Sequence, residues 1–84
     1  MENGVVMLEI LSPEKTLFKG EVTAVRLPGG KAPFVVLHNH APIITTLVAG
    51  AIVWESEAGE DSVAVAGGFA EVKENHVIAC VETL

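Results

Sequence analysis

The chain has 84 residues, with five Lys and Arg against eleven Asp and Glu, and its formal net charge is −6. This length allows one domain, residues 1–84, and the few scattered cations exclude a surface that neutralises nucleic-acid phosphates. Half of the residues are apolar, but no apolar stretch approaches the about 20 residues of a membrane-spanning helix, so we expect a soluble domain.

The start of the chain and its cysteine content indicate a cellular compartment. The sequence begins Met-Glu-Asn-Gly, which is acidic and polar and does not match a secretory signal peptide. Cys80 is the only cysteine and has no partner for an internal disulfide. We therefore expect a domain of the reducing cytosol.

The first part of the chain alternates short apolar runs with turn residues. Val5–Leu11 is a dense apolar run and predicts a strand. Ser12–Lys15 predicts a turn; a short helix capped by Ser12 is the alternative, but Gly20 ends the segment too soon, so a short strand over 16–18 is favoured. Residues 21–27 alternate apolar and polar, which is typical of a half-buried strand.

The remainder of the chain reads as further short strands. Phe34–His38 is apolar on both faces and is interpreted as the central strand, and Gly67-Gly68 and Glu74-Asn75 are interpreted as connections between later strands. The later predicted strands are 43–48, 51–57, 62–66, 69–73 and 76–82. Because no helical periodicity is present, the fold class is all-β, a flattened antiparallel β-sandwich or barrel of about nine to ten short strands.

The last predicted strand is apolar on both of its faces. Val77, Ala79 and Val81 share one face, and Ile78 and Cys80 share the other. A two-layer sandwich buries only one face of each sheet, so we expect another protein to cover the outer face. The alternative is the ordinary exposure of apolar atoms on any small protein.

Two loops rich in Pro and Gly flank the predicted strand 34–38, and the second of them holds or adjoins two histidines. His38 and His40 have the spacing of metal ligands on a strand, with His76 as a conceivable third, but no Cys, Asp or Glu lies nearby in the sequence. We expect no metal there and interpret the histidines as part of a polar partner surface. Cys80 lies among Val, Ile and Ala and is predicted to be a buried, inert thiol.

The sequence holds no recognisable catalytic or cofactor-binding pattern. Gly29-Gly30-Lys31 is too short for a phosphate-binding loop and no helix follows it. The serines have no His or Asp at a spacing known from nucleophilic catalysis. We expect neither catalysis nor a cofactor.

Four segments occur in a specific order and spacing: Leu8–Val22, Leu27–Gly29, Asn39–Ile44 and Ala66–Val72. With them, and over essentially all 84 residues, the chain resembles the N-terminal β-sandwich domain of the epsilon subunit of F-type ATP synthase, called delta in mitochondria. The resemblance implies a non-catalytic central-stalk subunit. Such a subunit binds the gamma subunit and the membrane rotor c-ring and couples ion-driven rotation to ATP synthesis.

The resemblance also implies a location and a set of contact residues. A stalk subunit lies at the cytoplasmic face of the bacterial inner membrane and touches the membrane only indirectly, through the ring. The gamma subunit becomes the candidate cover for the apolar outer face. The residues implied at the ring-facing end are Gly29, Gly30, Lys31, Asn39, His40, Ala41 and Pro42.

Three departures from the family pattern stand out. After Leu-Pro-Gly the family usually has an acidic residue and a Gly, but this chain has Gly30 and Lys31 after Leu27-Pro28-Gly29. We therefore expect a charge contact with the ring to differ. His38 and Asn39 replace a common Pro and Gly, which changes the loop. The chain also stops at Leu84, where the family's inhibitory C-terminal helical hairpin begins, so we expect that regulation to be absent.

Two alternatives from other functional classes remain. One is a small metal- or ligand-binding β-sandwich that uses His38 and His40. The other is a standalone adaptor domain that binds a different partner through its apolar face.

Overall fold

A computed structural model describes residues 4–84, and none of these residues lies in a helix, so no helix long and apolar enough to cross a membrane is found among them. The described chain forms eight strands: β1 Val6–Leu11, β2 Thr16–Val22, β3 Ala24–Leu27, β4 Phe34–Val36, β5 Ile43–Leu47, β6 Gly50–Ser56, β7 Gly59–Lys73 and β8 His76–Thr83. The prediction of an all-β fold is confirmed.

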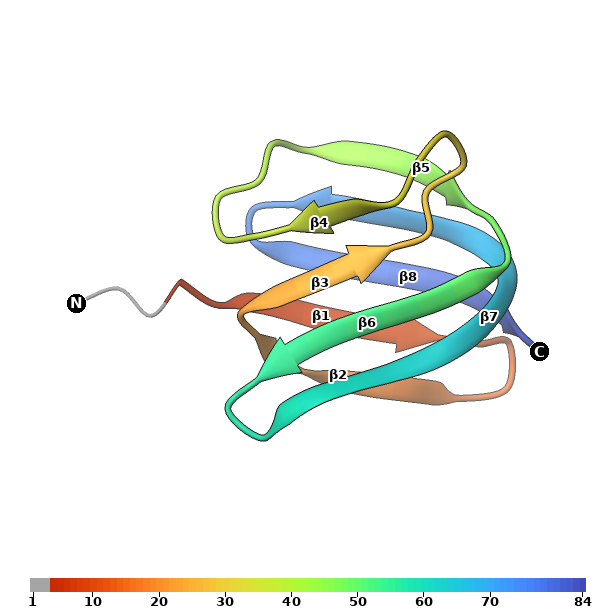
Figure 1. Cartoon of the computed structure of the whole chain (residues 1–84), viewed down its shortest axis with the longest axis horizontal. Helices are drawn as coiled ribbons and strands as arrows, with labels where there is room; N and C mark the ends of the chain where they lie inside the picture. Colours follow the sequence, from red (N-terminus) through yellow and green to blue (C-terminus); the bar gives the residue numbers. More distant parts are fainter. Residues whose placement is uncertain (1–3) are drawn as a thin grey trace.

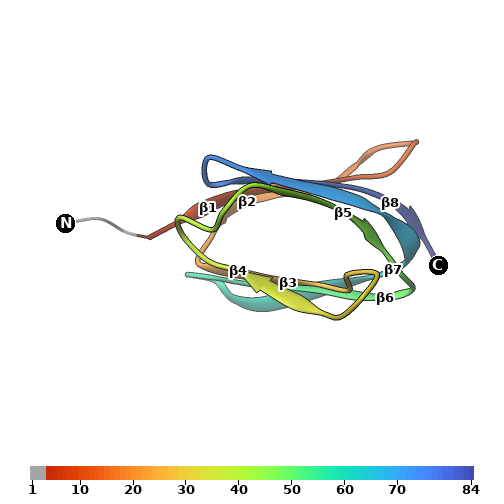
Figure 2. The ribbon, with the colours of Figure 1, turned by 90° about the horizontal axis from the view of Figure 1, so that it is seen from above.

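The strands form two packed layers that share β7 (Figures 1 and 2). The five-stranded layer has the order β2-β1-β8-β7-β5, and the four-stranded layer has the order β7-β6-β3-β4. The hydrogen-bonded path ends at β2 and β4 and does not close. The fold is therefore a sandwich with open edges, and not a closed barrel.

Strand β7 passes from one layer to the other at Gly67 and Gly68. Its residues 59–65 pair with β6, its residues 68–72 pair with β5, and its ladder with β8 shifts register between Val65 and Gly67. The sequence predicted a connection between two strands here, and that prediction is wrong. The glycines let one continuous strand bend, with φ +146° at Gly68, so the fold has eight strands and not nine to ten.

A strand does form within the predicted segment 34–38, but its predicted central position and its last two residues are wrong. Strand β4 has three residues, lies at the edge of its layer and pairs only with β3, because the chain turns at His38 and Asn39. The sandwich is not wholly antiparallel either. Strand β1 pairs with β8 in parallel, with Met7 opposite His76, since both strands start at the same end of the sandwich.

The predicted strands over 16–18 and 21–27 divide differently in the structure. Strand β2 continues through Gly20 to Val22, and Thr23 then separates it from β3. At this break the Thr23 backbone N–H donates to the Glu55 carbonyl at 2.8 Å. The chain thereby leaves the five-stranded layer and enters the four-stranded one beside β6.

The turn prediction over Ser12–Lys15 agrees with the structure. The Ser12 hydroxyl accepts hydrogen bonds from the backbone N–H groups of Glu14 at 3.3 Å and Lys15 at 3.2 Å. These local hydrogen bonds stabilise the turn. The turn reverses the chain, so β1 and β2 pair as an antiparallel hairpin.

The inward faces of both layers meet in one apolar core without any buried polar side chain among residues 4–84. Val77, Ala79 and Val81 point inward from β8 as predicted, and Ile78 and Cys80 lie half-buried on the outer face. Near the β2 edge, the rings of Phe18 and Trp54 lie 4.5 Å apart between centroids. The residues of the core are Val6, Leu8, Ile10, Val22, Val25, Leu27, Val36, Leu47, Ile52, Trp54, Val65, Ala70, Val72, Val77, Ala79 and Val81.

The crossing at Gly68 generates a prediction about stability. A Cβ at Gly68 would collide with the carbonyl oxygen of Cys80 and lie 2.9 Å from the Cα of Val81, on the rigid backbone of β8. We expect Gly68→Ala to lower the free energy of unfolding by about 3 kcal/mol or more, measured by urea denaturation.

Gly59→Ala is the matched control for backbone strain. Gly59 has φ +110°, but nothing lies within 4 Å of an added Cβ, so only strain remains, at about 1 to 2 kcal/mol. Equal losses in the two variants would contradict the role of close packing at the crossing.

Candidate partner-binding surfaces

An apolar patch covers part of the outer face of the five-stranded layer. Strand registers place Leu11 beside Cys80 and Cys80 beside Phe69, while Ile78 and Ile44 both flank Glu71. Ile44 and Phe69 are 74% and 53% exposed, which is high for large apolar side chains in strands. We call Leu11, Ile44, Phe69, Ile78 and Cys80 the apolar patch, although the exposed Glu71 lies between Ile44 and Ile78 and Thr46 is the partner of Phe69 on β5.

A shallow groove runs beside the patch where the β1–β2 turn meets β7 and β8. It has a volume of about 470 Å³ and is lined by the Leu11, Phe69 and Cys80 side chains of the patch and by Pro13 and Gly68, among others. The groove is therefore a continuation of the apolar patch. A partner side chain could fill it.

Charged groups border the apolar patch on the β1 side. The imidazole Nε2 of His76 lies 2.8 Å from Glu9 Oε1, and the Lys19 ammonium lies 4.0 Å from the other oxygen of the same carboxylate. These side chains are partly exposed, so each pair contributes at most about 1 kcal/mol to stability. Their effect is to give the patch a polar rim, as protein interfaces have.

The outer face of the four-stranded layer is different. Arg26 lies at its centre, between Val35 and Val53, with Glu55 and Glu60 on the same stretch of surface. Alanines occupy many of its other outward positions, at 24, 51 and 64. This face offers less large apolar surface than the apolar patch.

The β3–β4 loop, residues 28–33, is tied to strand β5. The Gly30 N–H donates to the Thr46 carbonyl at 3.0 Å, and the Val48 N–H donates to the Pro28 carbonyl at 2.9 Å. Pro28 and Gly29 are buried, whereas Lys31 is exposed. The loop therefore has a fixed base and presents its lysine to solvent.

The β4–β5 loop, residues 37–42, contains a turn and has two internal hydrogen bonds that involve His40. The His40 backbone N–H donates to the Leu37 carbonyl at 3.1 Å, and the His40 Nδ1 lies 2.7 Å from the Ala41 carbonyl oxygen, to which it donates. Asn39 has φ +68°, a left-handed conformation that Asn tolerates. Ala41 and Pro42 are exposed.

The seven residues predicted for the ring-facing end thus form two clusters. Gly29, Gly30 and Lys31 lie in one loop, and the residues 39–42 lie in the other. Figure 1 shows the loops at opposite ends of β4, along the edge of the sandwich that β4 and β5 form. The structure brings the members of each cluster together but keeps the clusters apart.

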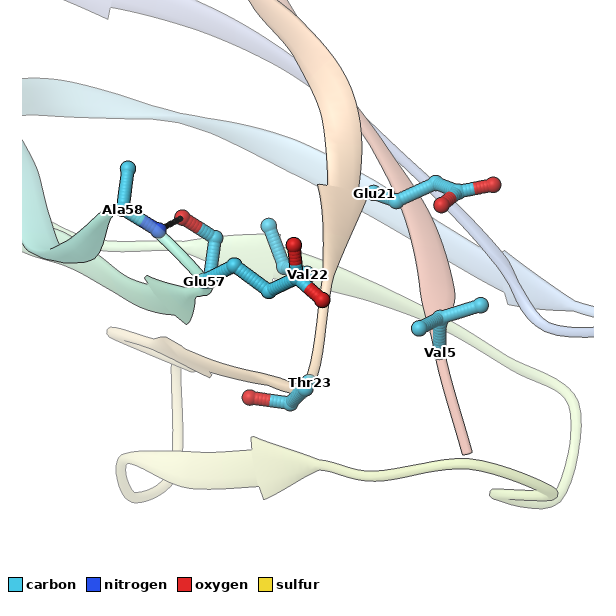
Figure 3. Close-up of a pocket in the computed structure, with 7 residues that line it drawn as sticks. Val5, Glu21, Val22, Thr23, Glu57 and Ala58 are labelled. Carbon is cyan, nitrogen blue, oxygen red and sulfur yellow. Dashed lines mark hydrogen bonds between the residues drawn. The ribbon is translucent and has the colours of Figure 1, made fainter. Parts of the chain in front are cut away.

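A hollow of about 350 Å³ lies between the end of β2 and the β6–β7 turn (Figure 3). Two carboxylates border it, but Glu57 reaches toward Val22 while Glu21 points away. The Ser56 hydroxyl accepts a hydrogen bond from the Ala58 N–H at 3.2 Å. The polar groups around this hollow do not converge on a common point, as they would in a catalytic site.

The candidate metal ligands His38 and His40 lie in the β4–β5 loop, and Cys80 lies on β8. Within residues 4–84, no group of three or more His, Cys, Asp and Glu is arranged to hold a metal ion. Cys80 was predicted to be buried, and this is wrong. It is half-buried on the outer face, because Ala79 and Val81 occupy the inward positions of β8.

Sequence reasoning missed three members of the apolar patch. Ile78 and Cys80 were recognised because β8 is apolar on both faces. Leu11, Ile44 and Phe69 join them only through strand pairing, which no local pattern reveals. No excess of apolar residues marks this face in the sequence, because its outward positions also hold Glu9, Thr46, Glu71 and Lys73.

Comparison with known families gives one match over almost the whole chain. Residues 5–84 match the family described as ATP synthase, Delta/Epsilon chain, beta-sandwich domain.

Curated relatives agree with this match. The ATP synthase epsilon chain of Leptospira borgpetersenii serovar Hardjo-bovis (strain JB197) is 46% identical over 72 residues, which cover 83% of this chain and 55% of the relative. That of Desulfitobacterium hafniense (strain DSM 10664 / DCB-2) is 36% identical over 95% of this chain and 61% of its own length. That of Chlorobium limicola is 40% identical over 89% of this chain and 86% of its own length. The chain spans about half the length of the first of these relatives.

Two solved structures share the fold. A chain in the Euglena gracilis mitochondrial ATP synthase structure, which contains OSCP, F1 and the c-ring, superposes with a TM-score of 0.86 at 21% identity, over 96% of this chain and 52% of that one. A chain in the central stalk and c-ring structure of the Tetrahymena thermophila mitochondrial ATP synthase gives 0.75 at 14% identity, over 92% of this chain and 63% of that one.

Proposed function

The chain belongs to the family of ATP synthase delta/epsilon β-sandwich domains, and from this membership we propose that it serves as a non-catalytic part of the central stalk of a rotary ATP synthase. The family match over residues 5–84 carries this proposal. In this role the domain binds two partners, the gamma subunit and the c-ring, and turns with them. It transmits rotation driven by ions to the sites of ATP synthesis on other subunits.

The gamma subunit is the proposed occupant of the apolar patch. Large apolar side chains that are exposed side by side mark a surface that another protein covers. The patch combines the exposed Phe69 and Ile44 with a groove and a charged rim, which is the arrangement of a protein interface. The four-stranded layer, with Arg26 and two glutamates on its outer face, fits solvent better.

The c-ring is the proposed partner of the β3–β4 and β4–β5 loops. Both loops have a defined backbone and lie along one edge of the sandwich, so they can contact a single neighbouring surface. Their exposed groups include the Lys31 ammonium and the loop at His40, Ala41 and Pro42. The domain then lies at the cytoplasmic face of the bacterial inner membrane and reaches the membrane only through the ring.

The proposed gamma interface predicts the effect of a charge in the apolar patch. We expect Phe69→Asp to weaken binding to the cognate gamma subunit by about 30-fold or more, since it places a carboxylate at the centre of an apolar contact. The measurement is titration calorimetry, after co-elution of the unmodified chain with gamma on size-exclusion chromatography.

Val35→Asp is the matched control on the opposite outer face. Val35 is 48% exposed, against 53% for Phe69, so both substitutions place a carboxylate at a similarly exposed strand position. We expect Val35→Asp to change the affinity for gamma by less than about threefold. The reverse order of effects would move gamma to the four-stranded layer, and no binding by the unmodified chain would favour an adaptor with another partner.

The proposed ring interface predicts a separate effect at His40. We expect His40→Ala to weaken attachment to the purified c-ring by about three- to tenfold while the melting temperature changes by less than about 2 °C, because the side chain lies in a surface loop. Glu60→Ala is the control, since Glu60 lies at the start of β7, paired with Glu55 of β6 and outside both loops, and it should leave attachment unchanged. Unchanged attachment in His40→Ala would remove His40 from the ring contact.

A further inference from the structure

Two asparagines that are 36 residues apart in the sequence, Asn39 and Asn75, are joined by two hydrogen bonds. The backbone N–H of Asn39 donates to Oδ1 of Asn75 at 2.5 Å, and Nδ2 of Asn75 donates to Oδ1 of Asn39 at 3.2 Å. The first residue lies in the β4–β5 loop and the second in the turn between β7 and β8. These two bonds therefore join a loop that connects the two layers to a hairpin of the five-stranded layer.

The β7–β8 turn does not itself require an asparagine side chain at position 75. Lys73 pairs with His76, so Glu74 and Asn75 form a two-residue hairpin turn, with φ +53° and +61°. Positive φ at both positions is the geometry of a type I′ turn, in which Gly is favoured as well as Asn. The side chain of Asn75 is thus available for its bond to Asn39.

The backbone around Asn75 is held firmly, which makes it a suitable anchor. Its carbonyl oxygen accepts a hydrogen bond from the Met7 N–H at 2.9 Å, at the start of β1. The strands β7 and β8 that flank it belong to the core ladder. The position of the Asn75 amide is therefore fixed by the sandwich itself.

The β4–β5 loop, in contrast, is largely exposed, although His38 and His40 are half-buried and the His40 ring lies 6.3 Å from the Phe34 ring of β4 between centroids. Leu37, Asn39, Ala41 and Pro42 are exposed, and the bonds of His40 to Leu37 and Ala41 stay inside the loop. The bonds to Asn75 connect the loop to a different part of the fold. They also support the left-handed conformation of Asn39, which directs the chain toward His40.

We propose that Asn75 is a positioning residue that fixes the β4–β5 loop in the conformation in which it contacts the c-ring. The second half of this proposal rests on the ring contact proposed above. A loop held in its bound conformation loses less conformational entropy on binding, so the amide pair strengthens attachment without touching the ring. Asn75 lies outside the residues that sequence reasoning assigned to the ring-facing end.

Asn75→Gly tests the positioning, with Glu74→Gly as the matched control. Both replace a residue of positive φ in the same turn by Gly, but only the first removes the amide. We expect the ¹⁵N order parameters of residues 39–42 in the isolated chain to fall from about 0.85 to below about 0.6 in Asn75→Gly, and to be unchanged in Glu74→Gly. Equal order parameters in the two variants would overturn the proposal.

Asn75→Asp is a second, conservative variant. It keeps an oxygen that can accept from the Asn39 N–H but removes the donor, so we expect a loop whose order lies between those of the unmodified chain and Asn75→Gly. This variant also keeps the proposal testable if Asn75→Gly fails to fold. In that case the comparison is with the unmodified chain: order parameters of residues 39–42 in Asn75→Asp that equal those of the unmodified chain would overturn the positioning, because the Nδ2 donor to Asn39 is gone.

Binding to the purified c-ring tests the functional half separately. We expect Asn75→Gly to weaken attachment by about three- to tenfold, as His40→Ala does, and Glu74→Gly to leave it unchanged. If the loop loosens but neither Asn75→Gly nor His40→Ala alters attachment, the positioning stands and the proposed ring contact of this loop is wrong. If His40→Ala weakens attachment to the c-ring but Asn75→Gly loosens the loop without weakening attachment, the proposed role of Asn75 in ring binding is wrong.

Discussion

The passage of β7 from one layer to the other is the constraint on which this sandwich depends. At Gly68 the strand runs so close to the backbone of β8 that a side chain does not fit, and the bend lets residues 59–65 pair with β6 while 68–72 pair with β5. The same bend places Phe69 on the outer face of the five-stranded layer, next to Cys80. The geometry of the crossing thus builds the apolar patch as well as the core.

Local patterns predicted those parts of the fold that short-range chemistry determines. The Ser12–Lys15 turn, the Glu74-Asn75 turn and the two faces of β8 follow from residue types at fixed spacing. A glycine pair gives the same signal for a turn and for a bent strand, so Gly67-Gly68 was misread. The edge position of β4 and the parallel pairing of β1 with β8 depend on contacts between distant segments, which periodicity does not encode.

The candidate surfaces show the same division. The sequence indicated that an outer face of β8 needs a cover, but Leu11, Ile44 and Phe69 join Ile78 and Cys80 only when four strands are paired in register. The loop residues 29–31 and 39–42 were predicted as a contact surface from the family resemblance, and the structure adds the hydrogen bonds that hold the two loops. The role of Asn75 could not be predicted from the sequence, because its hydrogen-bond partner Asn39 lies 36 residues away in the chain.

The most direct test of this account is the reactivity of Cys80, the single cysteine of the chain and a half-buried member of the apolar patch. The rate of its reaction with a maleimide is measured with the chain alone and in complex with the cognate gamma subunit. If gamma covers the patch, the complex should react at least about tenfold more slowly, because the thiol is no longer reached by solvent. An equal rate in a complex that demonstrably forms would show that gamma binds elsewhere on the sandwich.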